Sequence, residues 1–150
     1  MELILWRHAE AEDGVDDLAR ELTQKGRKQA AKMADWLNER LPKNCTVLAS
    51  PAVRAKDTAE ALGRPFRIVP TVSPGAPWQA VLEAAGWPGG EDDAVLIAGH
   101  QPTLGEVAAR LLGAEGSLSI RKAAVWWFSS RKRPGGNEVF LRAVMTPDLL

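Results

Sequence analysis

The stretch Ala94-Val95-Leu96-Ile97-Ala98-Gly99-His100-Gln101-Pro102 joins an uninterrupted apolar run to a polar junction. A short run of this kind, bounded by turn residues, is typical of a strand buried on both faces of a sheet. Pro102 stands where a first helical residue would be, and apolar residues from Leu104 to Leu112 recur at helical spacing before Gly113. The stretch therefore predicts a buried strand followed directly by a helix.

The same order of strand and helix occurs nearer the N-terminus. Residues 2–6 predict a short apolar strand, and the polar, acid-rich residues 10–21 are expected to form a surface loop. Thr23 is placed to cap a helix that Pro42 ends. Residues 46–49 predict a second strand, with Ser50 as the N-cap and Pro51 as the first residue of a helix running to about residue 62.

The rest of the chain completes the pattern. Residues 67–69 predict a brief strand and residues 77–85 a short helix, whereas residues 123–130 and 138–144 predict an antiparallel hairpin with a basic tip, Arg131-Lys132-Arg133. Alternating strands and helices are typical of a mostly parallel sheet with helices on both faces. We therefore expect one domain, residues 1–150, with a three-layer α/β sandwich, a C-terminal antiparallel hairpin and no cap domain.

Composition excludes several classes of function. The 150 residues carry a formal net charge of zero, so no broad cationic surface is available for nucleic acid. No apolar run approaches the roughly 18 residues of a membrane span. The lone Cys45 cannot form an internal disulfide, which favours a reducing, cytoplasmic setting. Two histidines, one distant cysteine and scattered carboxylates show no metal-ligand spacing, so neither a metal nor another cofactor is expected.

The residues with useful chemistry follow the predicted strands. Arg7 and His8 follow the first strand, Arg54 follows the second, and His100 follows the buried fourth strand. In a parallel sheet, ligands bind beyond the carboxyl ends of the strands. We therefore expect these side chains to converge on one pocket, with Gln101 beside them at the start of a helix.

Such a set suits a phosphoryl group. Arginine binds phosphate through paired hydrogen bonds, and helix N-termini after Ser50 and Gln101 would add backbone N–H groups. A neutral His8 could attack phosphorus, its neutral form being favoured by the nearby guanidinium charges, while His100 could donate to the phosphoryl oxygens. Taken singly, each residue also fits a plain structural role, such as a surface ion pair for Arg54 or a turn histidine for His100.

Four quoted segments resemble the histidine phosphatase superfamily, and most closely its small SixA-type phosphohistidine phosphatases. They are LILWRHAEAE (3–12), LTQKGRKQAAKMADWL (22–37), VLASPAVRAKDTAEAL (47–62) and VLIAGHQPTLGEVAARLL (95–112). The resemblance implies that His8 accepts the phosphoryl group, that Arg7 and Arg54 bind it, and that His100 completes the pocket. It also implies an α/β sandwich, no metal requirement and a cytoplasmic bacterial protein.

The sequence departs from the wider superfamily in two respects. Ala9 replaces the glycine that usually follows the first histidine, and the short connection between Gly63 and Ala94 leaves no room for the lid that carries a general acid in larger members. Glu10 and Glu12 are the candidate proton donors, although a solvated acidic loop is the plainer interpretation.

The missing acid bears on the substrate. An alkoxide leaves poorly unless it is protonated, whereas an imidazole needs much less help. The favoured substrate is therefore phosphohistidine on a signalling or phosphotransfer protein, with inorganic phosphate as product. The alternatives are a phosphatase or mutase acting on small phosphorylated molecules, and a non-catalytic adaptor that binds phosphorylated proteins.

Overall fold

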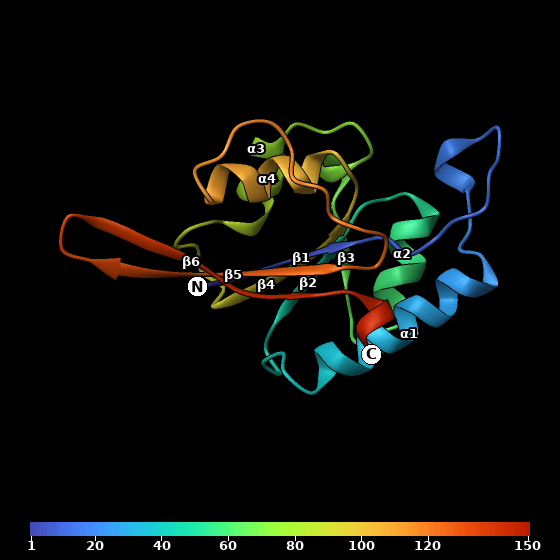
Figure 1. Ribbon diagram of the computed structural model, residues 1–150, viewed down its shortest axis with the longest axis horizontal. Coiled ribbons are helices and arrows are strands. Elements are labelled where there is room, and N and C mark those ends of the chain that lie inside the picture. The colour runs from blue at the N-terminus through green and yellow to red at the C-terminus, as the bar shows by residue number, and fades with distance from the viewer.

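The computed structural model describes residues 1–150 and contains one six-stranded sheet (Figure 1). The order across the sheet is β3-β2-β4-β1-β5-β6, where the strands are β1 (Glu2–Arg7), β2 (Thr46–Ala49), β3 (Arg67–Ile68), β4 (Ala94–Gly99), β5 (Val125–Arg133) and β6 (Gly136–Met145). The first four strands in this order are parallel to one another, and β5 and β6 are antiparallel to their neighbours. The expected α/β fold with a C-terminal hairpin is confirmed.

Helices cover both faces of the sheet (Figure 1). The helices α1 (Gln24–Asn38) and α2 (Val53–Glu60) lie on one side, and α3 (Trp78–Ala85) and α4 (Thr103–Leu111) lie on the other. Because side chains alternate along a strand, Ile4 and Trp6 of β1 pack with α1, whereas Leu3 and Leu5 pack with α3 and α4. None of these helices combines the length and the apolar character needed to span a membrane.

Strand β4 is buried along its whole length, as its apolar run predicted, because β1 and β2 flank it and its side chains pack into the cores on both faces of the sheet. Its register pairs Gly99 with Arg7 of β1 and Ala98 with Ala49 of β2. The three strands therefore end at the same edge of the sheet. The residues that follow them, including His8 and His100, emerge there.

Two helix starts differ from the sequence expectation. Helix α2 begins at Val53, not at Pro51, and Ala52 is its N-cap residue. Ser50 bonds the Ala52 N–H through its hydroxyl oxygen and also contacts a histidine, so its side chain is not free to cap the helix. Helix α4 begins one residue after Pro102. The predicted Thr23 cap is confirmed by a 2.9 Å bond from the Gly26 N–H to its hydroxyl.

The acid-rich segment 10–21 is more ordered than a plain surface loop. A β-bridge between Ala11 and Leu22 closes its base, and a short 3₁₀ turn, η1 (Asp17–Ala19), contacts α2. The β5–β6 hairpin extends from the opposite side of the molecule (Figure 1). The segment therefore reaches the neighbourhood of Arg54. The basic residues 131–133 lie far from it, and they belong to the end of β5 instead of the turn itself, because they pair with the start of β6.

Candidate active site

His8 is held in one ring orientation by the turn that follows β1. The residue is 8% exposed, and its Nδ1 lies 2.8 Å from the Ala9 carbonyl oxygen. A carbonyl only accepts hydrogen bonds, so Nδ1 carries the ring proton of the neutral form. The Nε2 atom of the neutral ring then keeps its lone pair and is the nucleophilic nitrogen.

The surroundings keep His8 neutral. Its pKa is lowered from 6.5 to about 4, chiefly by burial and to a lesser extent by the charges of Arg54, Arg7 and Arg20, against the opposing bond to Ala9. The guanidinium groups, which the sequence predicts as the cause, contribute less to this shift than burial does. An imidazole in this state is ready for nucleophilic attack at neutral pH.

His100 lies beside His8, with 5.3 Å between the ring centroids. Its Nε2 is 2.7 Å from the Ser50 hydroxyl, and that hydroxyl oxygen accepts from the Ala52 N–H at 3.2 Å. Burial, followed by the charge of His8, lowers the His100 pKa to about 3, so this ring is also neutral. Its Nδ1 is buried and has no partner within the protein.

The two arginines present different environments. Arg7 donates from Nη1 to the Ile120 carbonyl at 2.9 Å, and its Nε is buried without a partner. Arg54 is 5% exposed and donates to the Asp17 carbonyl at 2.7 Å and to the Asp17 carboxylate at 3.1 Å. Unpartnered buried nitrogens are rare in folded proteins. Arg7 Nε and the Nδ1 of His100 are two such atoms near one nucleophilic imidazole, as an anion site requires.

Thr58 connects the turn that carries His8 with the helix that carries Arg54. Its hydroxyl donates to the Arg54 carbonyl at 2.7 Å and accepts from the Ala9 N–H at 3.0 Å. The side chain is fully buried. Helix α2 therefore fixes the turn that carries His8 at the same time as it carries Arg54.

Comparison with known proteins identifies the family. The sequence model of the histidine phosphatase superfamily (branch 1) matches residues 3–75. A phosphohistidine phosphatase SixA homolog from Haemophilus influenzae is 30% identical, and the match covers 83% of this chain and 85% of that protein. The chain belongs to the histidine phosphatase superfamily, and within it to the SixA type.

Solved structures show the same fold. The protein histidine phosphatase SixA complexed with tungstate superimposes with a TM-score of 0.84 at 24% identity, over 99% of both chains. A phosphoserine phosphatase mutant from Entamoeba histolytica superimposes with a TM-score of 0.73 at 18% identity, over 99% of this chain and 98% of that chain. These likenesses concern the fold alone, and this histidine phosphatase fold therefore does not by itself decide the substrate.

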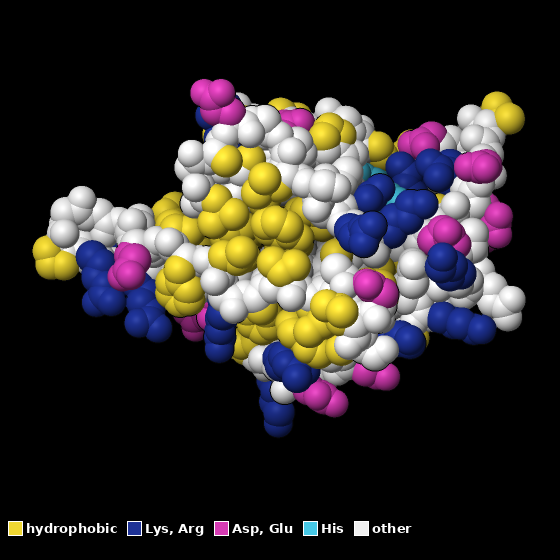
Figure 2. Space-filling view, in the orientation of Figure 1, with side chains coloured by type: hydrophobic (Ala, Val, Ile, Leu, Met, Phe, Trp, Pro, Cys, Tyr) yellow, Lys and Arg dark blue, Asp and Glu magenta, His cyan; other side chains and the backbone are white.

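Four of the residues expected in the site meet there. Arg7, His8, Arg54 and His100 gather at the carboxyl ends of the parallel strands, and the visible histidine atoms lie among Lys and Arg side chains (Figure 2). Gln101 is next to them, but its side chain is used elsewhere. Its side-chain amide donates to the Leu118 carbonyl and accepts from the Gly105 N–H, so this side chain is held against the loop after α4.

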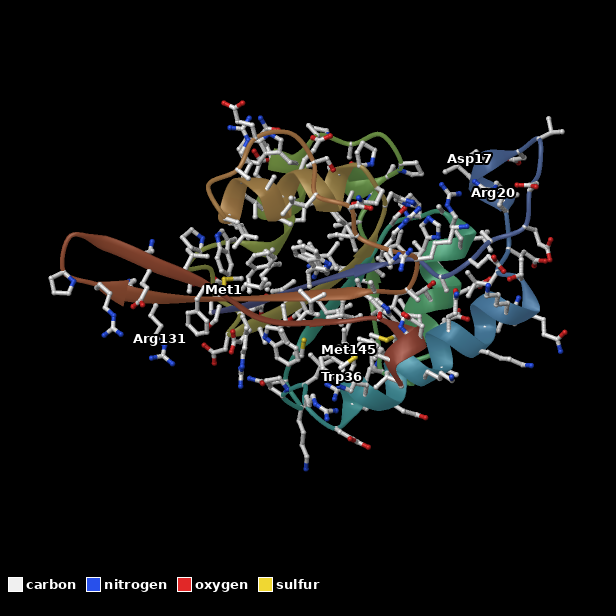
Figure 3. All side chains as sticks on the ribbon, viewed as in Figure 1. Met1, Asp17, Arg20, Trp36, Arg131 and Met145 are labelled. Carbon is white, nitrogen blue, oxygen red and sulfur yellow. The ribbon has the colours of Figure 1, made fainter.

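The two candidate proton donors do not join the group. The Glu10 carboxylate accepts from the Thr23 hydroxyl at 2.8 Å, because the turn after β1 packs on the start of α1. Glu12 is exposed, and its backbone carbonyl accepts from Arg20. The residues that sequence reasoning missed are Asp17 and Arg20, which lie on the segment beyond α2 (Figure 3).

Proposed function

We propose that this protein is a phosphatase that carries the phosphoryl group on His8 and removes it from phosphohistidine on another protein. The supporting observation is a neutral imidazole with a free Nε2, placed beside buried nitrogens of Arg7 and His100 that have no partner within the protein. Arg7 and Arg54 would bind the phosphoryl oxygens. We assign the ring proton of His100 to Nδ1, with Ser50 donating to Nε2, so that His100 also donates to the phosphoryl group.

The proposed first step transfers the phosphoryl group between two imidazoles. The lone pair of His8 Nε2 forms a bond to phosphorus while the bond from phosphorus to the substrate nitrogen breaks. The reacting form of the substrate is the phosphoimidazolium, in which the ring nitrogen that does not bear phosphorus is protonated, so the substrate leaves as a neutral imidazole. In the second step a water oxygen attacks phosphorus, the bond to His8 breaks, and dihydrogen phosphate is released. Neither step needs a proton donor from the protein.

The carboxylates near the site support this choice of leaving group. Glu10 is bonded to Thr23 and Glu12 is exposed. Hydrogen bonds from Arg20 and Arg54 lower the pKa of Asp17, which keeps this carboxyl ionised and unable to protonate an alkoxide. An ester leaving group would therefore depart without assistance. This disfavours the alternative of a broad phosphomonoesterase.

The second alternative, an adaptor that binds phosphorylated proteins without catalysis, does not require a nucleophile in the site. An adaptor would use Arg7, Arg54 and His100 but gains nothing from a nucleophilic nitrogen. The bond from His8 Nδ1 to the Ala9 carbonyl directs the lone pair to Nε2, and burial keeps that nitrogen unprotonated. Both features favour covalent chemistry over simple binding.

The test uses three phosphoryl donors in the presence of a chelator. Phosphoramidate, a protein domain phosphorylated on histidine, and p-nitrophenyl phosphate are each incubated with the protein, and acid-labile phosphate on the protein is measured. We expect labelling and turnover that disappear in the His8→Ala variant, with the phosphohistidine domain hydrolysed fastest. Wild-type rates in His8→Ala would contradict the nucleophile. Much faster hydrolysis of the ester would contradict the substrate.

A further inference from the structure

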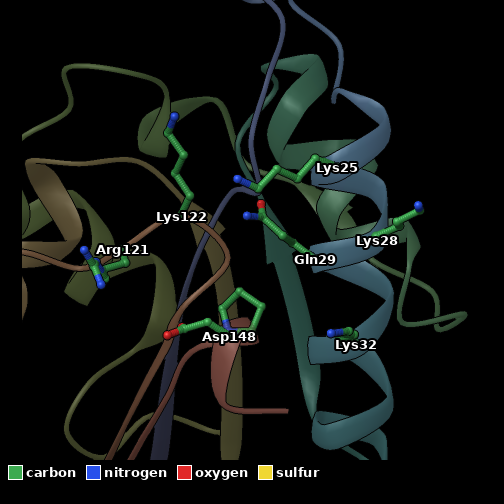
Figure 4. A pocket seen from close by; sticks show the side chains of 8 residues that line it. Lys25, Lys28, Gln29, Lys32, Arg121, Lys122 and Asp148 are labelled. Atoms are coloured by element: carbon green, nitrogen blue, oxygen red, sulfur yellow. The ribbon is translucent and has the colours of Figure 1, made fainter.

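A basic hollow lies beside the turn that carries His8. We name it the basic basin; its volume is about 540 Å³ (Figure 4). It is lined by Lys25, Lys28, Gln29, Lys32, Arg121, Lys122, Pro147 and Asp148. Five of these eight residues are cationic and one is acidic, although the chain as a whole has a formal net charge of zero. The hollow therefore concentrates positive charge locally.

The charges of the basin are not neutralised within the protein. Ion pairs within 4 Å occupy six arginines elsewhere in the fold, and none involves a cation of the basin. Lys32 reaches only the Leu150 carbonyl, at 3.4 Å. The carboxyl of Asp148 has a lowered pKa chiefly because the Thr146 side chain bonds it, with a minor contribution from the charge of Arg121. One carboxylate faces five cations, so the basin attracts anions.

One wall of the basin belongs to α1. Lys25, Gln29 and Lys32 are four and three residues apart, which places them on one face of this helix. The side-chain oxygen of Gln29 accepts a 3.0 Å bond from the Glu10 N–H, two residues after His8. This wall is therefore attached directly to the turn of the nucleophile.

The opposite wall, Arg121 and Lys122, is attached to the same turn. Ala123, the next residue, donates from its N–H to the His8 carbonyl at 3.1 Å. On the other side, the Ile120 carbonyl accepts from Arg7. Figure 4 shows Arg121 and Lys122 across the hollow from α1. An anion in the basin would therefore lie next to a phosphoryl group held by Arg7 and His8.

The lining indicates the kind of anion. Sites for small organic ligands are mostly apolar, with a few polar groups that fix orientation. The basin has no aromatic wall on which a base could stack and is lined by flexible, exposed cations. An extended acidic surface fits it better than an enclosed metabolite. We propose that the basic basin docks acidic side chains that surround the phosphohistidine of the protein substrate, an inference that rests on the proposed function.

Docking of this kind acts on the encounter with the protein substrate and not on the chemistry. Exposed charges attract a partner over about one Debye length, roughly 8 Å at physiological ionic strength, and the attraction weakens with salt. Complementary charges mainly raise association rates. The basin should therefore contribute to kcat/KM for a phosphorylated protein and leave small substrates unaffected.

The test compares two double variants that remove the same charge. Lys25→Gln/Lys122→Gln alters the basin, and Arg131→Gln/Lys132→Gln alters the hairpin tip on the far side of the molecule. Each is assayed with a phosphotransfer domain phosphorylated on histidine and with phosphoramidate, at about 20 mM and about 200 mM salt. The melting temperature of each variant checks its fold.

We expect the basin variant to lose about fivefold to tenfold in kcat/KM for the phosphorylated domain at low salt, and less at high salt. Its rate with phosphoramidate should stay within about twofold of wild type, and the hairpin variant should match wild type with both substrates. Equal losses in the two variants, or an equal loss with phosphoramidate, would overturn the docking role. Wild-type protein that hydrolyses phosphoramidate but not the phosphorylated domain would overturn the protein-substrate function together with this inference.

Discussion

Replacing Thr58 by valine tests how α2 supports the nucleophile. Valine keeps the shape of threonine but lacks the hydroxyl that accepts from the Ala9 N–H and donates to the Arg54 carbonyl. Thr58 and Ala9 are both fully buried, so that N–H loses its acceptor away from water. An unsatisfied buried group costs about 1–3 kcal/mol. We expect the free energy of unfolding to fall by about 2 kcal/mol.

The same change should slow the transfer of phosphate to His8. Ala9 makes two bonds: its N–H donates to Thr58, and its carbonyl accepts from the Nδ1–H of His8. A shift of Ala9 would therefore turn the imidazole of His8. Misplacement of a reacting group by about 1 Å can cost about a hundredfold in rate. Because Thr58→Val should move the imidazole by less than about 1 Å, we expect the rate of phosphoenzyme formation to fall about tenfold.

Denaturant unfolding and rapid-quench labelling with phosphoramidate measure the two effects. Thr103→Val is the matched control, because Thr103, the first residue of α4, is also buried and its hydroxyl donates to the Ala76 carbonyl. It should lose stability but keep its labelling rate. Thr58→Ser, which retains both bonds, should restore most of each property. A Thr58→Val protein that labels at the wild-type rate would refute the coupling of Thr58 to His8.

Four further outcomes follow from the site and the residues that support it. The pKa of His8 near 4 places the acid limb of the kcat/KM profile for phosphoramidate near pH 4 instead of 6.5, and a midpoint near 6.5 would contradict the burial argument. Because the unfolded chain protonates His8 and His100 before the folded protein does, each ring should lower the free energy of unfolding by about 3 kcal/mol as pH drops from 6.5 to 4, as denaturant titrations of the wild type and of His8→Ala would show. Asp17→Asn removes the negative charge beside Arg54, so this guanidinium should attract phosphate more strongly and inorganic phosphate should inhibit about threefold more strongly. Weaker inhibition would show that Asp17 orients the guanidinium instead. Gly26→Ala should lose about 2 kcal/mol despite the helix preference of alanine, since its Cβ would overlap the Glu10 carbonyl, whereas Gly89→Ala meets open space and should be neutral in thermal melts.

Sequence reasoning could locate the site because apolar runs define strand ends. The uninterrupted run before His100 marked the central strand, and parallel strands bring their carboxyl ends to one edge. Arg7, His8 and Arg54 could be added to the site on the same ground. These placements depend on hydrophobic patterning, which is a property of the sequence itself.

The missed residues depend on contacts that no pattern encodes. Asp17 lies in a polar segment without periodicity, and it reaches Arg54 only because the segment folds back over α2. Ser50 has the residue type and position of an N-cap, but His100 competes for its hydroxyl across 50 residues of sequence. Thr58 carried a weak signal, since it is one helical turn after Arg54 and was expected on the same helix.

Burial explains why His8 is nucleophilic and why neither histidine can protonate a leaving group. It keeps His8 unprotonated and therefore nucleophilic, and it holds the pKa of His100 near 3, so neither ring carries an acidic proton at neutral pH. The carboxylate that reaches Arg54, Asp17, is kept ionised by the arginines that bind it. The groups proposed to stabilise the transferred phosphoryl group thus leave the site without an acid for the leaving group. The proposed selection among substrates then follows from leaving-group chemistry, because a phosphohistidine ring can be protonated on its second nitrogen before the P–N bond breaks, whereas an alkoxide would have to acquire its proton from an acid in the site.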